Sequence, residues 1–263
     1  MIANFFQNLN SSDVDYLLIS GQATVLYGAA TFSEDIDLWV NPTPDNWEKF
    51  LNVLRSCAAR YYKLTPAFTL DHLKRGHGFH FVLPDEITKE VFLDVMGVPP
   101  RVASFDVAVS AARWMETQWG KVHTIGLKEL VELKKTQRLE DYPIISNLAL
   151  AWFDQPACPK TKADFDWAIE NIFTLTALRS FFEENPEVVD FDLRGTDHAL
   201  RIFGQHVTEE NSAPEETQQV LTAAMQQRMS ALQQADRFYW RNIISELKQL
   251  RAGDELMNEG DSV

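Results

Sequence analysis

The chain has 263 residues, of which 45% are hydrophobic and 24% are charged, and this composition excludes disordered, collagen-like and coiled-coil chains. The length allows one large domain or two smaller ones, each with a hydrophobic core. The formal charge of −14 excludes a protein that coats nucleic acid, because binding many phosphates requires a basic surface.

The cysteines and the apolar segments predict a cytoplasmic protein. Cys57 and Cys158 are too few for a disulfide framework, which favours a reducing compartment. The first ten residues lack the basic and apolar regions of a signal peptide, and no window reaches the ~18 apolar residues of a membrane span. We therefore expect no membrane partner.

Short apolar runs alternate with helical spacing through the first 150 residues. In chain order the pattern predicts a strand at 16–20, a helix at 22–28, a strand at 36–40, a helix at 45–60, strands at 78–83 and 91–95, a helix at 106–115, a strand at 121–125 and a helix at 127–139. Together these elements predict an α+β fold, with a small mixed sheet and flanking helices.

Residues 151–263 show helical spacing and almost no strand pattern. Apolar residues three and four apart predict one helix face over 165–178. Pro214 begins a long periodic stretch at 215–251, which Gly253 ends. The last ten residues are acidic, and we expect them to be frayed.

The charge and the prolines divide the chain. Residues 1–150 carry 14 Lys and Arg against 18 Asp and Glu, whereas residues 151–263 carry 10 against 20. Pro156 and Pro159 interrupt regular structure between the two parts. We therefore expect a boundary near Asp154–Lys160, with an α+β domain over 1–150 and a helical domain with an acidic tail over 151–263.

Three aspartates and a glycine turn form the most informative pattern. The first predicted strand ends in Ser20-Gly21, and the next opens with Asp35 and Asp37, whose spacing places both carboxylates on one face of a strand. Two such carboxylates repel each other unless a cation lies between them, and Mg²⁺ prefers oxygen ligands. Asp94 lies among apolar residues of a later strand, where burial without a partner is costly. A shared Mg²⁺ would be that partner.

An Asp-x-Asp pair by itself is most often a solvated turn or strand edge. The order of strand, glycine turn, helix, Asp-x-Asp and later aspartate is more specific, because over residues 14–145 it resembles the nucleotidyltransferase superfamily with its polymerase-β-like fold. The segment DIDLWV, which contains Asp35 and Asp37, carries most of the resemblance. Within that superfamily the chain looks most like the minor bacterial nucleotidyltransferases, a group that includes the AbiEii-like toxins.

The resemblance implies transfer of a nucleoside monophosphate from an NTP to an acceptor hydroxyl, with two Mg²⁺ ions. It implies that Asp35, Asp37 and Asp94 are catalytic metal ligands and that Ser20 and Gly21 contact the β- and γ-phosphates. It also implies an RNA 3′ end, such as that of a tRNA, as acceptor, in a toxin–antitoxin or phage-defence system. A partner protein or a small molecule stays open as acceptor, because the negative charge disfavours a long RNA.

A basic segment, residues 125–145, supplies further candidate phosphate ligands. On a helix over 127–139, Lys134 and Arg138 share a face, and Asp141 is placed to orient the Arg138 guanidinium. Periodicity alone favours a solvated helix with ion pairs. The resemblance favours binding of the triphosphate by Lys134 and Arg138, because a triphosphate requires cationic partners.

Two departures from the family pattern favour a different function. The family's Gly-Gly or Gly-Ser is Ser20-Gly21 here, and Thr31 stands where relatives often carry a basic residue. The alternative is a non-catalytic nucleotide-binding or protein-interaction module on a retained fold. We do not expect His77 and His80 to bind zinc, since a separation of three on a strand places them on opposite faces.

Overall fold

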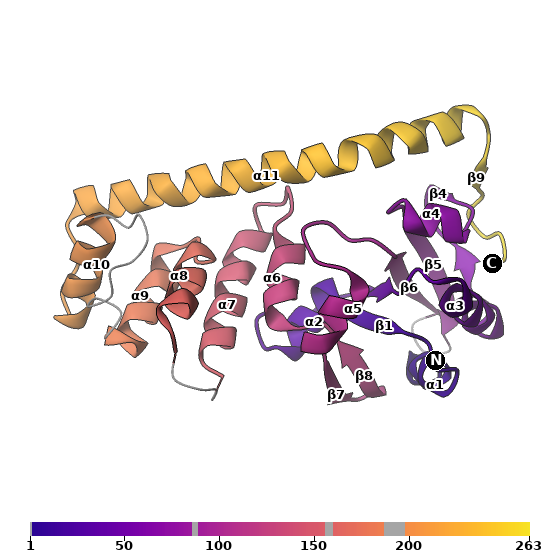
Figure 1. Cartoon of the computed structure of the whole chain (residues 1–263), viewed down its shortest axis with the longest axis horizontal. Helices are drawn as coiled ribbons and strands as arrows, with labels where there is room; N and C mark the ends of the chain where they lie inside the picture. The colour runs from indigo at the N-terminus through magenta and orange to yellow at the C-terminus, as the bar shows by residue number, and fades with distance from the viewer. Residues whose placement is uncertain (1, 86–88, 156–159, 187–197) are drawn as a thin grey trace. The chain divides into compact units, whose positions relative to one another are not determined.

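The computed structural model describes residues 2–85, 89–155, 160–186 and 198–263, whose elements are drawn in Figure 1. They make a mixed α/β protein with a mixed sheet, as the sequence predicts, but the sheet has seven strands where five were expected. The chain groups into two compact units, one of residues up to Leu133 with Phe238–Val263 and the other of Lys134–Arg237. Among the described helices, none has the length and apolar character needed to cross a membrane.

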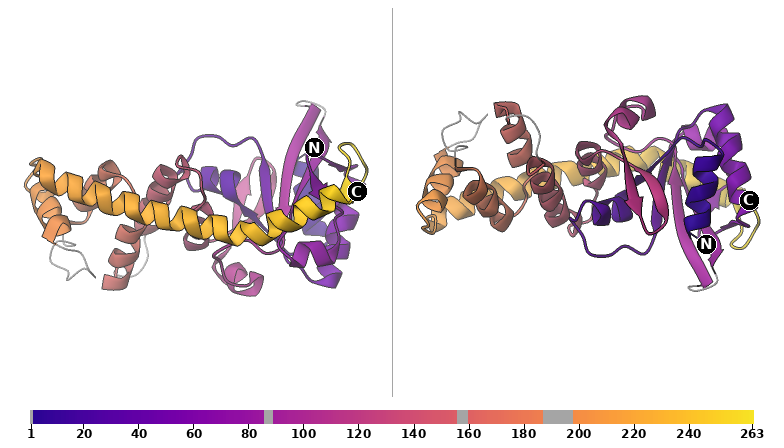
Figure 2. Two further views of the ribbon diagram at one scale, coloured as in Figure 1. Left: turned by 90° about the horizontal axis from the view of Figure 1, so that it is seen from above. Right: turned by 90° about the horizontal axis from the view of Figure 1, so that it is seen from below.

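The expected domain boundary at residue 150 stays a prediction. Part of the expected linker, residues 156–159, lies outside the described residues. In the compact units, residues 238–263 group with the sheet and not with the helices that precede them. Helix α11 (Glu215–Ala252) continues through the unit boundary without a break, as the left view of Figure 2 shows. Its bounds confirm the long helix predicted from periodicity.

The seven-stranded sheet lies in the first unit and has the order β3-β5-β6-β2-β1-β8-β7. Neighbours β1 and β8 run parallel, as do β2 and β6, and the other neighbours are antiparallel. The strands are β1 (Tyr16–Ile19), β2 (Ile36–Val40), β3 (Arg60–Tyr61), β5 (Gly78–Asp85), β6 (Lys89–Met96), β7 (Arg113–Thr117) and β8 (Gly120–Thr124). Val, Ile, Phe and Trp, which favour pleated strands, recur in β2, β5 and β6.

The helices of the first unit lie on both sides of this sheet. They are α1 (Ile2–Ser11), α2 (Ser20–Leu26), α3 (Pro44–Ser56), α4 (Leu70–Lys74), α5 (Phe105–Ala111), all but the last residue of α6 (Leu127–Lys134) and the end of α11. On one face Phe6 of α1 packs on Tyr16 of β1, with ring centroids 5.9 Å apart. Phe68, which contacts Phe50 of α3, lies 4.8 Å from Phe79 of β5. All five rings are buried, and burial of each stabilises the fold by about 1.5–3 kcal/mol.

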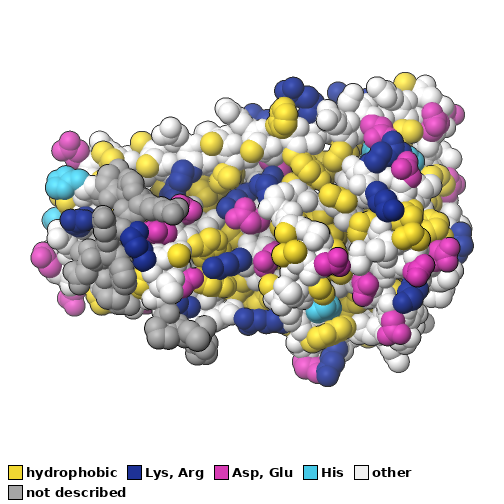
Figure 3. All heavy atoms as spheres, in the orientation of Figure 1, with side chains coloured by type: hydrophobic (Ala, Val, Ile, Leu, Met, Phe, Trp, Pro, Cys, Tyr) yellow, Lys and Arg dark blue, Asp and Glu magenta, His cyan; other side chains and the backbone are white. Residues whose placement is uncertain are grey.

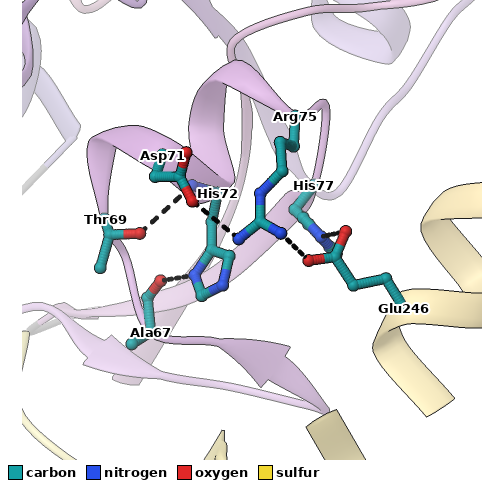
Figure 4. A network of polar contacts seen from close by, with 7 residues as sticks. All are labelled: Ala67, Thr69, Asp71, His72, Arg75, His77 and Glu246. Carbon is teal, nitrogen blue, oxygen red and sulfur yellow. Dashed lines mark hydrogen bonds and ion pairs between the residues drawn. The ribbon is translucent and has the colours of Figure 1, made fainter. Parts of the chain in front are cut away.

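Polar contacts attach the end of α11 to the segment around α4 within the first unit (Figure 4). Glu246 of α11 pairs with Arg75 and lies 3.0 Å, Oε2 to Nε2, from the buried His77. Arg75 also pairs with Asp71 at 2.9 Å. These contacts help to explain why residues 238–263 belong to the sheet unit, and they show that Arg75 is held by two carboxylates.

The expectation that the last ten residues are frayed is wrong. Strand β9 (Leu256–Met257) pairs antiparallel with β4 (Thr65–Pro66). The amide of Tyr61 donates to the carbonyl of Asp261 at 2.8 Å, and the amide of Gly260 donates to the carbonyl of Tyr61 at 2.9 Å. Most of these residues are exposed, but backbone hydrogen bonds form regardless of side-chain charge.

The helix predicted at 106–115 is shorter than expected. Helix α5 ends at Ala111, and β7 begins at Arg113. The strand forms because it pairs with β8 in a hairpin, where Trp114 stacks on His123 with ring centroids 4.5 Å apart. Cross-strand packing of this kind overrides a local helical spacing.

The second unit is helical. It contains α7 (Asp141–Phe153), α8 (Lys162–Glu170), α9 (Leu175–Glu184), α10 (His198–Thr208) and the first part of α11. The single helix expected over 165–178 is wrong, because Thr174 starts a new helix by accepting a hydrogen bond from the amide of Ala177 at 3.2 Å. The predicted apolar face is nevertheless shared, since Phe165 of α8 and Phe181 of α9 are 6.3 Å apart in one buried core.

Candidate functional site

Three polar side chains lie next to one another on adjacent strands of the sheet. In the parallel pair of β2 and β6, Asp37 is opposite Asp94, and in the antiparallel pair of β5 and β6, His80 is opposite Asp94. Directly paired residues point to the same face of a sheet. All three are half-buried, whereas Leu38, which points to the face covered by α1 and α3, is buried. The row Asp37–Asp94–His80 therefore lies on the opposite, partly solvated face.

A short distance further along β2, hydrophobic side chains cover the same face of the sheet. Trp39, two residues after Asp37, packs edge-on against Phe105 of α5, with ring centroids 5.4 Å apart. Its indole Nε1 donates to the carbonyl of Gly97 at 2.9 Å, and its side chain is only 2% exposed. The polar row thus lies beside a packed hydrophobic end of the face, which positions Asp37 rigidly.

The Ser20-Gly21 turn lies next to Asp37, because Ile19 of β1 pairs with Asp37 of β2. The left-handed backbone in this turn is that of Ser20, whose φ is 56°. Gly21 is required for space, since a Cβ there would overlap Ser33 Oγ and would lie 3.0 Å from Ser33 Cβ. The turn therefore brings the 29–35 connection against the start of α2.

Gly21→Ala is expected to destabilise the protein by about 1–3 kcal/mol, because an added methyl group has no room in this packed turn. Chemical denaturation measures the loss. The matched control is Ser20→Gly, which relieves the left-handed position and should leave stability equal or higher. Replacing Ser33 by Gly in the Gly21→Ala background should recover most of the loss, and no recovery would contradict this explanation.

Asp35 lies just before β2, close to the polar row. Burial raises the pKa of its carboxyl group, and the negative charge of Asp94 raises it further. Lys63 and His80 lower this pKa by smaller amounts. Asp35 and Asp94 are therefore close enough for their carboxylates to repel each other when both are ionised.

Asp35→Asn is expected to raise the melting temperature at neutral pH in the absence of divalent metal. When folding raises the pKa of an acid, the ionised form of that acid destabilises the folded state. The neutral amide of Asn removes this cost. The gain should shrink as the pH falls through the raised pKa, since the wild-type carboxyl is then neutral as well. Melting curves from about pH 4 to about pH 8 check this. Glu48→Gln on the exposed side of α3 makes the same charge change elsewhere, and an equal gain there would contradict the local explanation.

In the part of the chain that the structure describes, no group of three or more His, Cys, Asp or Glu residues is arranged to hold a metal ion. The in-register pair of Asp37 and Asp94 still fits Mg²⁺, which proteins commonly hold with one or two carboxylates, the remaining ligands being water and substrate phosphates. The raised pKa of Asp35 agrees, since a cation would relieve its repulsion from Asp94. The three-aspartate ligand set stays a prediction.

Four residues beside the carboxylates were not predicted from the sequence. His80 Nδ1 lies 2.7 Å from Asp94 Oδ1. Phe92, two residues before Asp94 on the same strand face, packs on Tyr62 with ring centroids 4.7 Å apart, and Lys63 Nζ lies 4.9 Å from the Tyr62 ring centroid. The pairing of β5 with β6 brings His80 beside Asp94, and the pairing of β3 with β5 brings Tyr62 and Lys63 to the same place, so no local spacing reveals this group.

Lys134 and Arg138 belong to the second unit and do not share a helix face, so the helix expected over 127–139 is wrong. Helix α6 ends at Lys134, because the Thr136 hydroxyl donates to Asp141 Oδ2 at 2.7 Å and accepts from the Arg138 amide at 3.1 Å. Asp141 pairs with Lys134 at 3.0 Å and does not orient Arg138. Phosphate binding by Lys134 and Arg138 stays a prediction.

A scan of the chain against protein-family models finds no match, and a search among curated proteins finds none that matches. Any functional conclusion therefore depends on the residues themselves. On the face drawn in Figure 3, Lys and Arg side chains lie among Asp and Glu side chains and do not gather in one basic patch.

Proposed function

We propose that the protein is an Mg²⁺-dependent nucleotidyltransferase, which transfers a nucleoside monophosphate from an NTP to an acceptor hydroxyl. The supporting observation is the register that sets Asp37 of β2 opposite Asp94 of β6. The Ser20-Gly21 turn lies at the other side of Asp37. Asp37, Asp94 and the Ser20-Gly21 turn thus lie on or directly after three neighbouring strands, β2, β6 and β1, and this arrangement supports the proposal.

In this proposal Asp37 and Asp94 hold the metal, and Asp35 contributes the third carboxylate. Mg²⁺, when bound, would stabilise the attacking and leaving oxygens of an in-line displacement at the α-phosphate, with pyrophosphate as the leaving group. The chain itself binds and orients the NTP. Ser20 would offer its hydroxyl and Gly21 its backbone amide as hydrogen-bond donors to the phosphates.

Positive charge for the triphosphate comes from Lys63, which lies beside Asp35 as the electrostatic contributions indicate. Lys63 would supply the positive charge that members of the nucleotidyltransferase superfamily often carry at the position of Thr31. Lys134 and Arg138 are further candidates from the second unit, although Lys134 already pairs with Asp141. The acceptor in this proposal is an RNA 3′ end, such as that of a tRNA, with a partner protein or a small molecule as the other possibilities, and the biological setting is a toxin–antitoxin or phage-defence system.

The proposal is tested by incubating the protein with Mg²⁺ and each NTP labelled at the α- or the γ-phosphate, together with tRNA or a cell extract. Label from the α-phosphate should pass to an acceptor, whereas label from the γ-phosphate should leave as pyrophosphate. The same transfer by the Asp37→Asn variant would contradict the proposal. Thermal stabilisation by NTP and Mg²⁺, about 2.7 kcal/mol at 100 times Kd, without any transfer would instead support a non-catalytic nucleotide-binding module.

A further inference from the structure

The imidazole of His80 contacts Asp94 across β5 and β6. The Nδ1 atom lies 2.7 Å from Asp94 Oδ1, and because an ionised carboxylate has no proton to donate, the hydrogen must be on Nδ1. The backbone of His80 is fixed on both sides of the strand. Its amide donates to Oγ1 of the fully buried Thr65 at 3.1 Å, and its carbonyl accepts from the amide of Tyr62 at 2.8 Å.

We infer that His80 is a positioning residue that orients Asp94 toward the divalent cation of the proposed nucleotidyltransferase site. The hydrogen bond occupies Oδ1 and fixes the rotation of the carboxylate, which is otherwise broadly distributed. Oδ2 is then left for the cation that Asp94 shares with Asp37, the neighbour on its other side. This inference rests on the proposed function.

The stability of the fold alone does not explain why His80 and Asp94 are paired. The side chains of His80 and Asp94 are 30% and 32% exposed, and a partly exposed pair of this kind contributes little to the stability of the fold. At position 80 an apolar side chain, like that of Phe92 on the same face, would contribute more to packing than the imidazole does. A fixed carboxylate has a larger effect on metal binding, since partners that orient a metal ligand typically change affinity or activity 10–100-fold.

Two substitutions separate the ring nitrogens. In His80→Asn the amide nitrogen takes the place of Nδ1 and can still donate to Asp94, whereas in His80→Gln it takes the place of Nε2 and cannot. Binding of Mn²⁺ to the full-length chain, followed by electron paramagnetic resonance, should be 10–100-fold weaker in His80→Gln and within about threefold of wild type in His80→Asn. Melting temperatures of both variants should stay close to that of the wild type.

The outcomes distinguish this inference from the proposed function. If the wild type takes up Mn²⁺ and Asp37→Asn does not, but His80→Gln binds as tightly as the wild type, the inference is overturned and the proposed function stands. Equal losses in His80→Asn and His80→Gln also overturn it. A wild type that takes up no Mn²⁺ overturns both. Should His80→Gln fail to fold, long-range ¹H–¹⁵N spectra of the neutral ring in the wild type decide, because a proton on Nε2 instead of Nδ1 refutes the inference.

Discussion

Asp94→Asn is expected to lower kcat/KM for nucleotide transfer by about 10³-fold or more, the largest effect of any single substitution in the sheet. The reason is that the carboxylate faces Asp37 across β2 and β6, and a metal held there supplies several kcal/mol of transition-state stabilisation. The amide keeps the shape of the side chain and an oxygen for His80, so folding should be preserved. Steady-state transfer of labelled nucleotide measures the loss.

Glu90→Gln is the matched control for this experiment. Glu90 lies four residues before Asp94 on the same strand β6, on the same face but about 13 Å away. The substitution Glu90→Gln removes the same charge from the same strand, and we expect less than a twofold change in the rate of nucleotide transfer. Similar losses in Asp94→Asn and Glu90→Gln would mean that overall charge, and not the paired carboxylates, determines activity.

Asp141→Ala should destabilise the second unit by about 3–5 kcal/mol, because it leaves a buried ammonium group without its partner. The side chains of Lys134 and Asp141 are only 12% and 6% exposed, with Nζ and Oδ1 3.0 Å apart. The Thr136 hydroxyl, 2.7 Å from Asp141 Oδ2, would lose its acceptor at the same time. Urea unfolding of the full-length protein measures the change.

Two comparisons make this prediction specific. The double variant Lys134→Met with Asp141→Ala removes both charges and should recover most of the lost stability. Asp166→Ala breaks the more exposed pair with Lys162, at 3.2 Å with side-chain exposures of 41% and 16%, and should cost no more than about 1 kcal/mol. Equal losses for Asp141→Ala and Asp166→Ala would contradict the assignment of Lys134 as a buried, paired cation.

The central strands and the long C-terminal helix follow from local pattern. Alternating and continuous apolar runs predicted β2, β5 and β6 to within a few residues, and the period of α11 gave both of its ends. These elements are predictable because their hydrophobic period matches their geometry. The glycine turn and the Asp-x-Asp pair were found for the same reason, since they lie at the ends of such strands.

The errors arise where side chains or distant strands decide the outcome. The hydroxyls of Thr136 and Thr174 replace helical bonds and so end or restart a helix. Strand β7 and the C-terminal strand β9 form only because a partner strand is present. His80 joins the carboxylates through the pairing of β5 with β6, and Lys63 follows β3, which pairs with β5. Strand register is a tertiary property that spacing along the chain does not contain.

The most direct test of the account is anomalous diffraction from crystals grown with Mn²⁺ and a non-hydrolysable NTP. We expect an anomalous peak within coordination distance, about 2.0–2.3 Å, of one oxygen from each of Asp37 and Asp94, with the triphosphate beside Ser20 and Gly21. Nucleotide bound elsewhere, or Mn²⁺ bound away from both carboxylates, would contradict it.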